Sequence, residues 1–190
     1  MTFSQRRGRH LVLLIAISEN RPKYDNIEST LYDLAHFEKF LIAKMGVKQE
    51  DILKFINKEA TIENLDEAIN VILQKALKLN SAINQEKSDE KILITVYASC
   101  HGFMRCTSHI YLPNGDPEGD EPGLGTGAYY DIEGKLHSLQ DSLKHAFIIG
   151  VMDCCRNELP SKGTSKPYSP PKKGSLCMKY ATRPGDAAFV

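Results

Sequence analysis

Hydrophobic residues gather in four short, nearly continuous runs along the chain, at residues 11–17, 92–98, 146–152 and 176–181. Each run is rich in β-branched or aliphatic side chains and shows little alternation between apolar and polar positions. Strands that are covered on both faces have this pattern, which is typical of parallel sheets. The runs therefore predict central strands of a largely parallel sheet, and a shorter run at 52–56 is a candidate fifth strand.

Amphipathic stretches between these runs predict three helices. The first begins near Ser29 and ends at Gly46, because glycine suits a helix C-terminus. The second follows Thr61, a good N-cap residue. The apolar stripes are Leu31, Leu34, Phe37, Leu41 and Met45 in the first helix, Leu65, Ala68, Ile69, Ile72, Leu73 and Ala76 in the second, and Leu136, Leu139, Leu143 and Ala146 in the third. Strands alternating with helices predict a three-layer α/β/α fold with a largely parallel central sheet.

The composition is that of an ordinary globular protein and does not indicate an activity. The chain has 190 residues, enough for one domain with a single core, and its hydrophobic fraction of 42% is ordinary for a globular protein. Lys and Arg together number 24, as do Asp and Glu, so the net charge is zero. We therefore expect neither nucleic acid nor a membrane surface as a partner.

The cysteine count points to a reducing compartment. The chain has 5 cysteines, and an odd number does not suit a secreted disulfide framework. We expect reduced thiols in a cytoplasmic protein. The alternative is a signal peptide, because Arg6, Arg7 and Arg9 precede the apolar run at 11–17. That run is far too short to span a bilayer, and the predicted sheet uses it as its first strand.

A histidine and a cysteine follow two of the predicted strands. The strand at 92–98 continues into Ser-Cys-His-Gly, which contains His101 and Gly102, and the strand at 146–152 continues into Asp-Cys-Cys-Arg, which contains Cys155. Sites of parallel sheets form where the carboxyl ends of strands meet. An imidazole there can take the proton of a thiol and later protonate a leaving amine. The N–H groups of Gly102 and Cys155 could form an oxyanion hole.

Four segments in order resemble those of caspase-like cysteine peptidases, and of metacaspases and paracaspases in particular. Residues 96–102 are similar to a Tyr-Ser-Gly-His-Gly turn, 153–156 to the nucleophile segment, 180–185 to the strand that opens the small subunit, and 31–37 to a helix that carries an acidic residue. The separation of His101 and Cys155 is 155 − 101 = 54 residues, close to the roughly 50 expected in caspases.

The resemblance implies one caspase-like catalytic domain over residues 1–190. Its large-subunit-like part would cover 9–157 and an exposed linker 158–175, with the start of a small-subunit-like part at 176–190. The family normally continues past the position of Val190. We therefore expect a fragment or a minimal version, in which a homodimer or a partner chain completes the small-subunit region.

The resemblance also implies the roles of single residues. His101 would be the general base and Cys155 the nucleophile of an endopeptidase that forms a thioester with a protein or peptide substrate. Substrate-binding residues would be Asp33, Asp153, Thr182 and Phe189. A carboxylate at Asp153 favours a cationic side chain, so we predict cleavage after Arg or Lys. Val190, at the place of a pocket arginine in caspases, cannot pair with an acidic substrate.

Some features leave alternatives open. Cys100 replaces the usual glycine before the histidine, so a catalytically impaired module that binds or scaffolds partner proteins is the rival function. Cys100, Cys106 and His109 match no common zinc spacing, and we expect no metal or cofactor. The acidic stretch at 116–121 is typical of a solvated loop, and it does not support the calcium activation that some metacaspases show, because its spacing lacks the hand-type loop pattern. We expect Cys154 to point into the core, opposite to Cys155.

Overall fold

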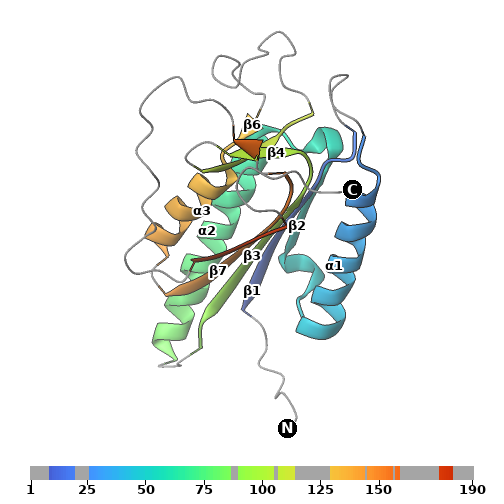
Figure 1. Ribbon diagram of the computed structural model, residues 1–190. Coiled ribbons are helices and arrows are strands. Elements are labelled where there is room, and N and C mark those ends of the chain that lie inside the picture. Colours follow the sequence, from blue (N-terminus) through green and yellow to red (C-terminus); the bar gives the residue numbers. More distant parts are fainter. Residues whose placement is uncertain are drawn as a thin grey trace, which may run out of the picture.

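A parallel five-stranded sheet forms the centre of the computed structural model (Figure 1). Its strand order is β2-β1-β3-β7-β9. The strands are β1 (His10–Ala16), β2 (Ile52–Ile56), β3 (Ile92–Ser99), β7 (Ala146–Asp153) and β9 (Leu176–Tyr180). The structure describes residues 9–19, 26–86, 90–104, 107–113, 129–143, 145–155, 157–158 and 176–181. All five predicted strands are thus present, but among the described residues β9 lies at an edge of the sheet rather than in its centre, and none of its residues is buried.

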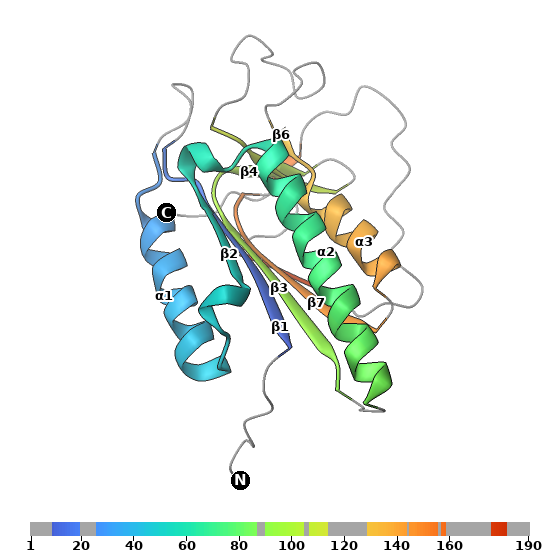
Figure 2. The same cartoon turned by 180° about the vertical axis from the view of Figure 1, so that it is seen from behind.

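Helices cover both faces of this sheet, as Figures 1 and 2 show from opposite sides. One face carries α1 (Ser29–Met45), which packs on β1 and β3. The other face carries α2 (Ile62–Gln85) and α3 (Ile132–Ser142), which pack on each other and on the sheet. The predicted three-layer α/β/α architecture is therefore present. Among the described helices, none combines the length and apolar character that crossing a bilayer requires.

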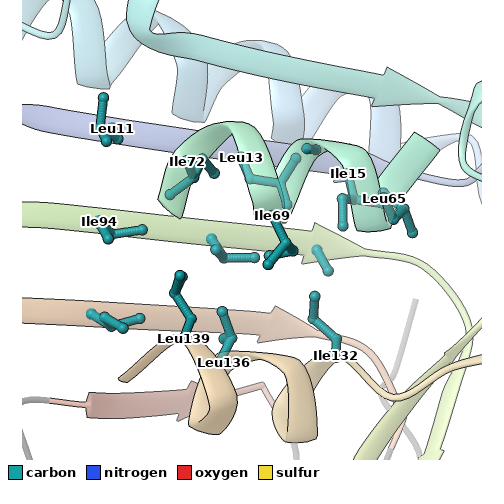
Figure 3. Packing of buried hydrophobic residues seen from close by; sticks show 14 of the residues in the cluster. Leu11, Leu13, Ile15, Leu65, Ile69, Ile72, Ile94, Ile132, Leu136 and Leu139 are labelled. Carbon is teal, nitrogen blue, oxygen red and sulfur yellow. The ribbon is translucent and has the colours of Figure 1, made fainter. Parts of the chain in front are cut away.

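The core explains why the apolar run at 11–17 contains no polar alternation. All seven residues of β1 are buried, because helices lie over both of its faces. Leucine and isoleucine side chains of β1 and β3 meet those of α2 and α3 in the larger core cluster (Figure 3). A smaller cluster lies under α1 and includes Leu34, Leu41 and Tyr97. The two clusters fix which strand faces point toward which helices.

Two helix ends follow the local signals. The N–H of Asn64 donates to the Thr61 hydroxyl at 3.2 Å, so Thr61 caps α2 as predicted. Gly46 ends α1 with φ +69°, a left-handed conformation that glycine adopts without a Cβ penalty. These caps set the points at which the chain turns back toward the sheet.

Two parts of the helix predictions were wrong. Ala146 is the first residue of β7, because α3 ends at Ser142 and the chain re-enters the sheet. Leu31 and Met45 lie at the two ends of the α1 stripe, and their side chains are 37% and 47% exposed. Only the middle of α1 meets the sheet closely, since Leu34 and Leu41 are its buried leucines.

A second, smaller sheet stands beyond the carboxyl ends of β3 and β7. It consists of β4 (Gly102–Met104), β5 (Ser108–Tyr111), β6 (Tyr129–Tyr130) and β8 (Asn157–Glu158) in the order β6-β5-β4-β8. The sequence patterns did not predict it, because strands of two to four residues are too short to show a period. Its β4 begins at Gly102, directly after His101, so it helps to hold the candidate site.

Several predicted features lie outside the described residues. The acidic stretch at 116–121 is one, and the predicted linker at 158–175 is another apart from Glu158. Thr182 and Phe189, the two further substrate-binding candidates, also lie outside them.

Candidate active site

The turns that carry His101 and Cys155 follow neighbouring strands. Ser99 and Asp153 are register partners at the ends of β3 and β7. One step further, the N–H of Cys100 donates to the carbonyl oxygen of Asp153 at 3.3 Å. His101 and Cys155 therefore each lie two residues beyond a paired position, at the same edge of the sheet. Both side chains are half-buried, which leaves them accessible at this edge.

The small sheet fixes the backbone around His101. The N–H of Tyr111 donates to the His101 carbonyl oxygen at 3.0 Å, and Gly102 pairs with Ile110 in the antiparallel ladder. Phe103 is 1% exposed, and its ring stacks on that of His109 with centroids 5.0 Å apart. These contacts hold the turn after β3 in one conformation.

Helix α3 packs against β5 of the small sheet and supports it. The buried carboxylate of Glu133 accepts a hydrogen bond from the N–H of Ser108 at 2.8 Å. Asp131 accepts hydrogen bonds from the Thr107 hydroxyl at 2.7 Å and from the N–H of Gly134 at 2.9 Å. Asp131 therefore caps α3 and ties β5 to it, so the position of His101 depends indirectly on these two carboxylates.

Gly102 lies where no side chain fits. A Cβ at this position would meet the Sγ of Cys154 at 2.9 Å, the carbonyl oxygen of His109 at 2.9 Å and the carbonyl oxygen of Cys155 at 3.0 Å. Two of the three neighbours are backbone atoms, which cannot move aside cheaply. The glycine thus lets the turn after β3 approach the turn after β7 closely, and its backbone lies beside that of Cys155.

The three cysteines near this edge differ in accessibility. Cys100 and Cys154 are 3% and 2% exposed and belong to the hydrophobic core, whereas Cys155 is half-buried. Burial is the main cause that raises the pKa of the Cys100 thiol, and nearby Cys154, Asp153 and Cys155 raise it further. Cys100 therefore stays protonated, and Cys155 is the most accessible of the three thiols.

Two predicted pocket carboxylates come together on the α1 side of these turns. Asp33 lies on α1 with an exposed side chain, and Asp153 ends β7 with a half-buried one. Burial is the largest cause that raises the pKa of Asp153, and the negative charge of Asp33 raises it further. Two carboxylates whose charges act on each other make a region of negative potential at the edge of the sheet.

Tyr97 completes this group, and sequence reasoning did not assign it a role. Its hydroxyl donates to the Oδ2 of Asp153 at 3.5 Å. Burial raises the pKa of Tyr97 to about 12, so the hydroxyl keeps its proton. The available signal was a tyrosine inside an otherwise aliphatic run, because a buried tyrosine hydroxyl normally needs a polar partner.

Metal ligands do not gather in the part of the chain that the structure describes. Among the described residues, no group of three or more His, Cys, Asp or Glu side chains could hold a metal ion, and Cys106 of the zinc alternative lies outside them. A pocket lined by Ile92, His145 and Ala146 lies at the amino ends of β3 and β7. It is at the opposite end of these strands from His101 and Cys155.

The geometry thus brings five predicted residues to one edge of the sheet. His101, Gly102 and Cys155 lie together, and Asp33 and Asp153 flank them on the α1 side. A partly exposed thiol can perform nucleophilic chemistry once an imidazole takes its proton, and carboxylates whose charges act on each other can bind a cation. A scan against protein-family models gives no match to this chain, and a search of curated proteins also gives none.

Proposed function

We propose that this protein is a cysteine endopeptidase that cleaves proteins or peptides after Arg or Lys. The observation that carries the proposal is the register of β3 and β7, which puts the His101 turn and the Cys155 turn side by side. The resemblance of both turns to those of caspase-like peptidases agrees with this assignment. So does the presence of two carboxylates next to them.

The reaction would proceed through a thioester. His101 takes the proton from the Sγ of Cys155, and the thiolate attacks the substrate carbonyl carbon. The oxygen of that carbonyl gains negative charge and accepts hydrogen bonds from the N–H groups of Gly102 and Cys155. The C–N bond then breaks, and His101 returns the proton to the leaving amine. Water finally hydrolyses the thioester and regenerates the thiol.

The preference for a basic residue rests on Asp33 and Asp153. A guanidinium or ammonium group gains hydrogen bonds and charge attraction from two carboxylates, whereas an acidic side chain is repelled. No cofactor is needed for these steps. We also infer a cytoplasmic location, because the described cysteines, which include the exposed Cys177, are thiols, as a reducing compartment favours.

An active-site label tests the nucleophile. A peptide chloromethylketone that ends in arginine should attach once to the protein, at Cys155, and mass spectrometry of the digest would locate it. Cys155→Ala should lose the label, while the matched control Cys154→Ala should keep it, because Cys154 is buried. Equal labelling of the two variants would show that the nucleophile is assigned wrongly.

Substrate comparison tests the pocket. Peptides that end in arginine, lysine or aspartate before the scissile bond should be cleaved in the order basic before acidic. Asp153→Ala should lower kcat/KM for the arginine peptide. A preference for aspartate, or an unchanged kcat/KM in Asp153→Ala, would contradict the specificity.

A module without catalysis that binds partner proteins is the second candidate function. Exposed apolar side chains on one helix and one strand favour it, since such patches often mark interaction surfaces. They are Leu31, Tyr32, Phe40, Ile42 and Met45 on α1 and Phe147 on β7. Cys100 in place of glycine also fits this candidate. Absence of both label and cleavage, together with a dimer or a stable complex in light scattering, would favour it over the peptidase.

An edge strand offers a place for the proposed partner chain. Among the described residues, β9 pairs with β7 alone and is an edge strand. Edge strands and exposed apolar residues are places where a second chain can add. We propose a second copy of this chain as that partner. A monomeric mass at high protein concentration would exclude a homodimer.

A further inference from the structure

Tyr97 is held rigidly between the sheet and α1. It lies in the second half of β3, and its side chain is 5% exposed. Its ring stacks on that of Phe37 from α1, with centroids 4.7 Å apart and planes 27° from parallel. Because both rings belong to the smaller core cluster or pack against it, the tyrosine ring cannot turn away without disturbing that cluster.

The hydroxyl of Tyr97 meets a carboxylate at the end of the next strand. It donates to the Oδ2 of Asp153 at 3.5 Å, which is long for an O–H donor. Ser99, on the same strand, also hydrogen-bonds to Tyr97. Burial keeps the tyrosine protonated at any pH at which the protein would work, so the hydroxyl remains available as a donor.

We propose that Tyr97 is a positioning residue of the cation-binding pocket, whose hydroxyl orients the carboxylate of Asp153 toward the substrate side chain. The substrate part of this inference rests on the proposed peptidase function, whereas the effect on Asp153 does not. A carboxylate held by one hydrogen bond keeps its other lone pairs for a guanidinium or ammonium group.

The environment of Asp153 contains influences that shift the pKa of its carboxyl group in opposite directions. Burial raises its pKa most, and Asp33 on α1 raises it further, whereas the hydrogen bond from Tyr97 on β3 lowers it. The Cys100 thiol also lies near this carboxylate. On β9, Lys179 is the register partner of Val151, two residues before Asp153. The hydrogen bond from Tyr97 therefore opposes the rise in the pKa of Asp153 that burial and the charge of Asp33 cause.

The test is Tyr97→Phe, which removes the hydroxyl and keeps the ring that stacks on Phe37. For an arginine peptide, KM should rise about three- to tenfold, as loss of one hydrogen bond predicts, while kcat stays nearly unchanged. Loss of the hydrogen bond raises the pKa of Asp153. The acidic limb of the kcat/KM profile should therefore move to higher pH. An unchanged KM and an unchanged limb would overturn the proposal.

Asp33→Asn should shift the pKa of Asp153 in the opposite direction from Tyr97→Phe. Removal of the Asp33 charge lowers the pKa of Asp153, so the acidic limb should move to lower pH even though KM rises. Opposite movements in Asp33→Asn and Tyr97→Phe are the signature of the proposed arrangement. Movements in the same direction would contradict it.

Tyr130→Phe is the matched control for a lost tyrosine hydroxyl. Tyr130 is 3% exposed, and its hydroxyl donates to Asp66 at 2.7 Å, away from the pocket. This variant should lose stability and keep the KM and pH profile of the wild type. If Tyr130→Phe and Tyr97→Phe change KM equally, the effect is general destabilisation and the proposal fails.

A titration without substrate separates this inference from the peptidase proposal. Carbon-13 NMR of the Asp153 carboxyl in the full chain should show a higher pKa in Tyr97→Phe than in the wild type. That result supports the positioning role even if no peptide is cleaved, in which case only the peptidase proposal has failed. An unchanged Asp153 titration overturns the positioning role even if peptides are cleaved.

Discussion

Replacement of Gly102 by alanine tests the close approach of the two turns. The new Cβ would lie 2.9 Å from the His109 carbonyl oxygen, 3.0 Å from the Cys155 carbonyl oxygen and 2.9 Å from the Cys154 Sγ. Contacts this short force the backbone to shift by a few tenths of an ångström. Overpacking of this kind costs about 1–3 kcal/mol in folding free energy. For a chain of this size the melting temperature should fall by roughly 2–12 °C.

The same shift should reduce catalysis more than stability. Gly102 and Cys155 are the proposed oxyanion donors, and their separation changes when the turns move apart. Loss of one such donor lowers kcat by about 10²–10³. We expect a fall of that order for Gly102→Ala when kcat is measured well below the melting temperature of the variant, on an arginine peptide.

Gly150→Ala is the matched control. Its Cβ would meet the Sδ of Met178 at 2.5 Å, the Cε of Met178 at 2.8 Å and a methyl of Leu136 at 3.0 Å. These atoms belong to flexible side chains of β9 and α3, so the variant should lose stability and keep its kcat. The reasoning is refuted if Gly102→Ala retains wild-type kcat, or if both variants lose kcat equally at the same folded fraction.

Three further predictions concern stability. Burial lowers the pKa of His10 in the folded protein, so as pH falls the unfolded chain takes up this proton before the folded protein does. The free energy of unfolding should therefore fall as pH drops below about 6.5. His10→Asn should make that dependence on pH weaker in urea titrations at several pH values. Asp131→Ala removes the N-cap that accepts from Gly134 and should cost about 0.5–2 kcal/mol by the same titrations; a loss below that range would contradict the capping role. Leu13→Ala, at a fully buried position, should cost about 2–5 kcal/mol, and a calorimetric melt near wild type would show that the core is packed differently.

Local sequence signals were sufficient for the elements of the main sheet. A continuous apolar run is typical of a strand covered on both faces, and β1 is buried along its whole length. Thr61 and Gly46 mark helix ends because their capping is a local interaction. The third helix was extended wrongly to Ala146, since an apolar residue suits either a helix stripe or a buried strand.

The candidate site was only partly readable in the same way. The positions of His101 and Cys155 after two strands can be read from the chain, and so can the exposure difference expected of Cys154 and Cys155. The role of Tyr97 could not be read, because its partner Asp153 is 56 residues away in the chain. The small sheet that holds the His101 turn was missed because its strands are too short to have a period.

The amino-acid sequence by itself determined which segments become strands and helices, and which chemical groups stand at their ends. These properties depend on side chains within a few residues of one another. Tertiary structure alone decided that β3 and β7 are neighbours in register, and that Asp33 from α1 reaches the end of β7 beside Tyr97. Such choices depend on how whole faces of strands and helices pack together, and no local pattern encodes that.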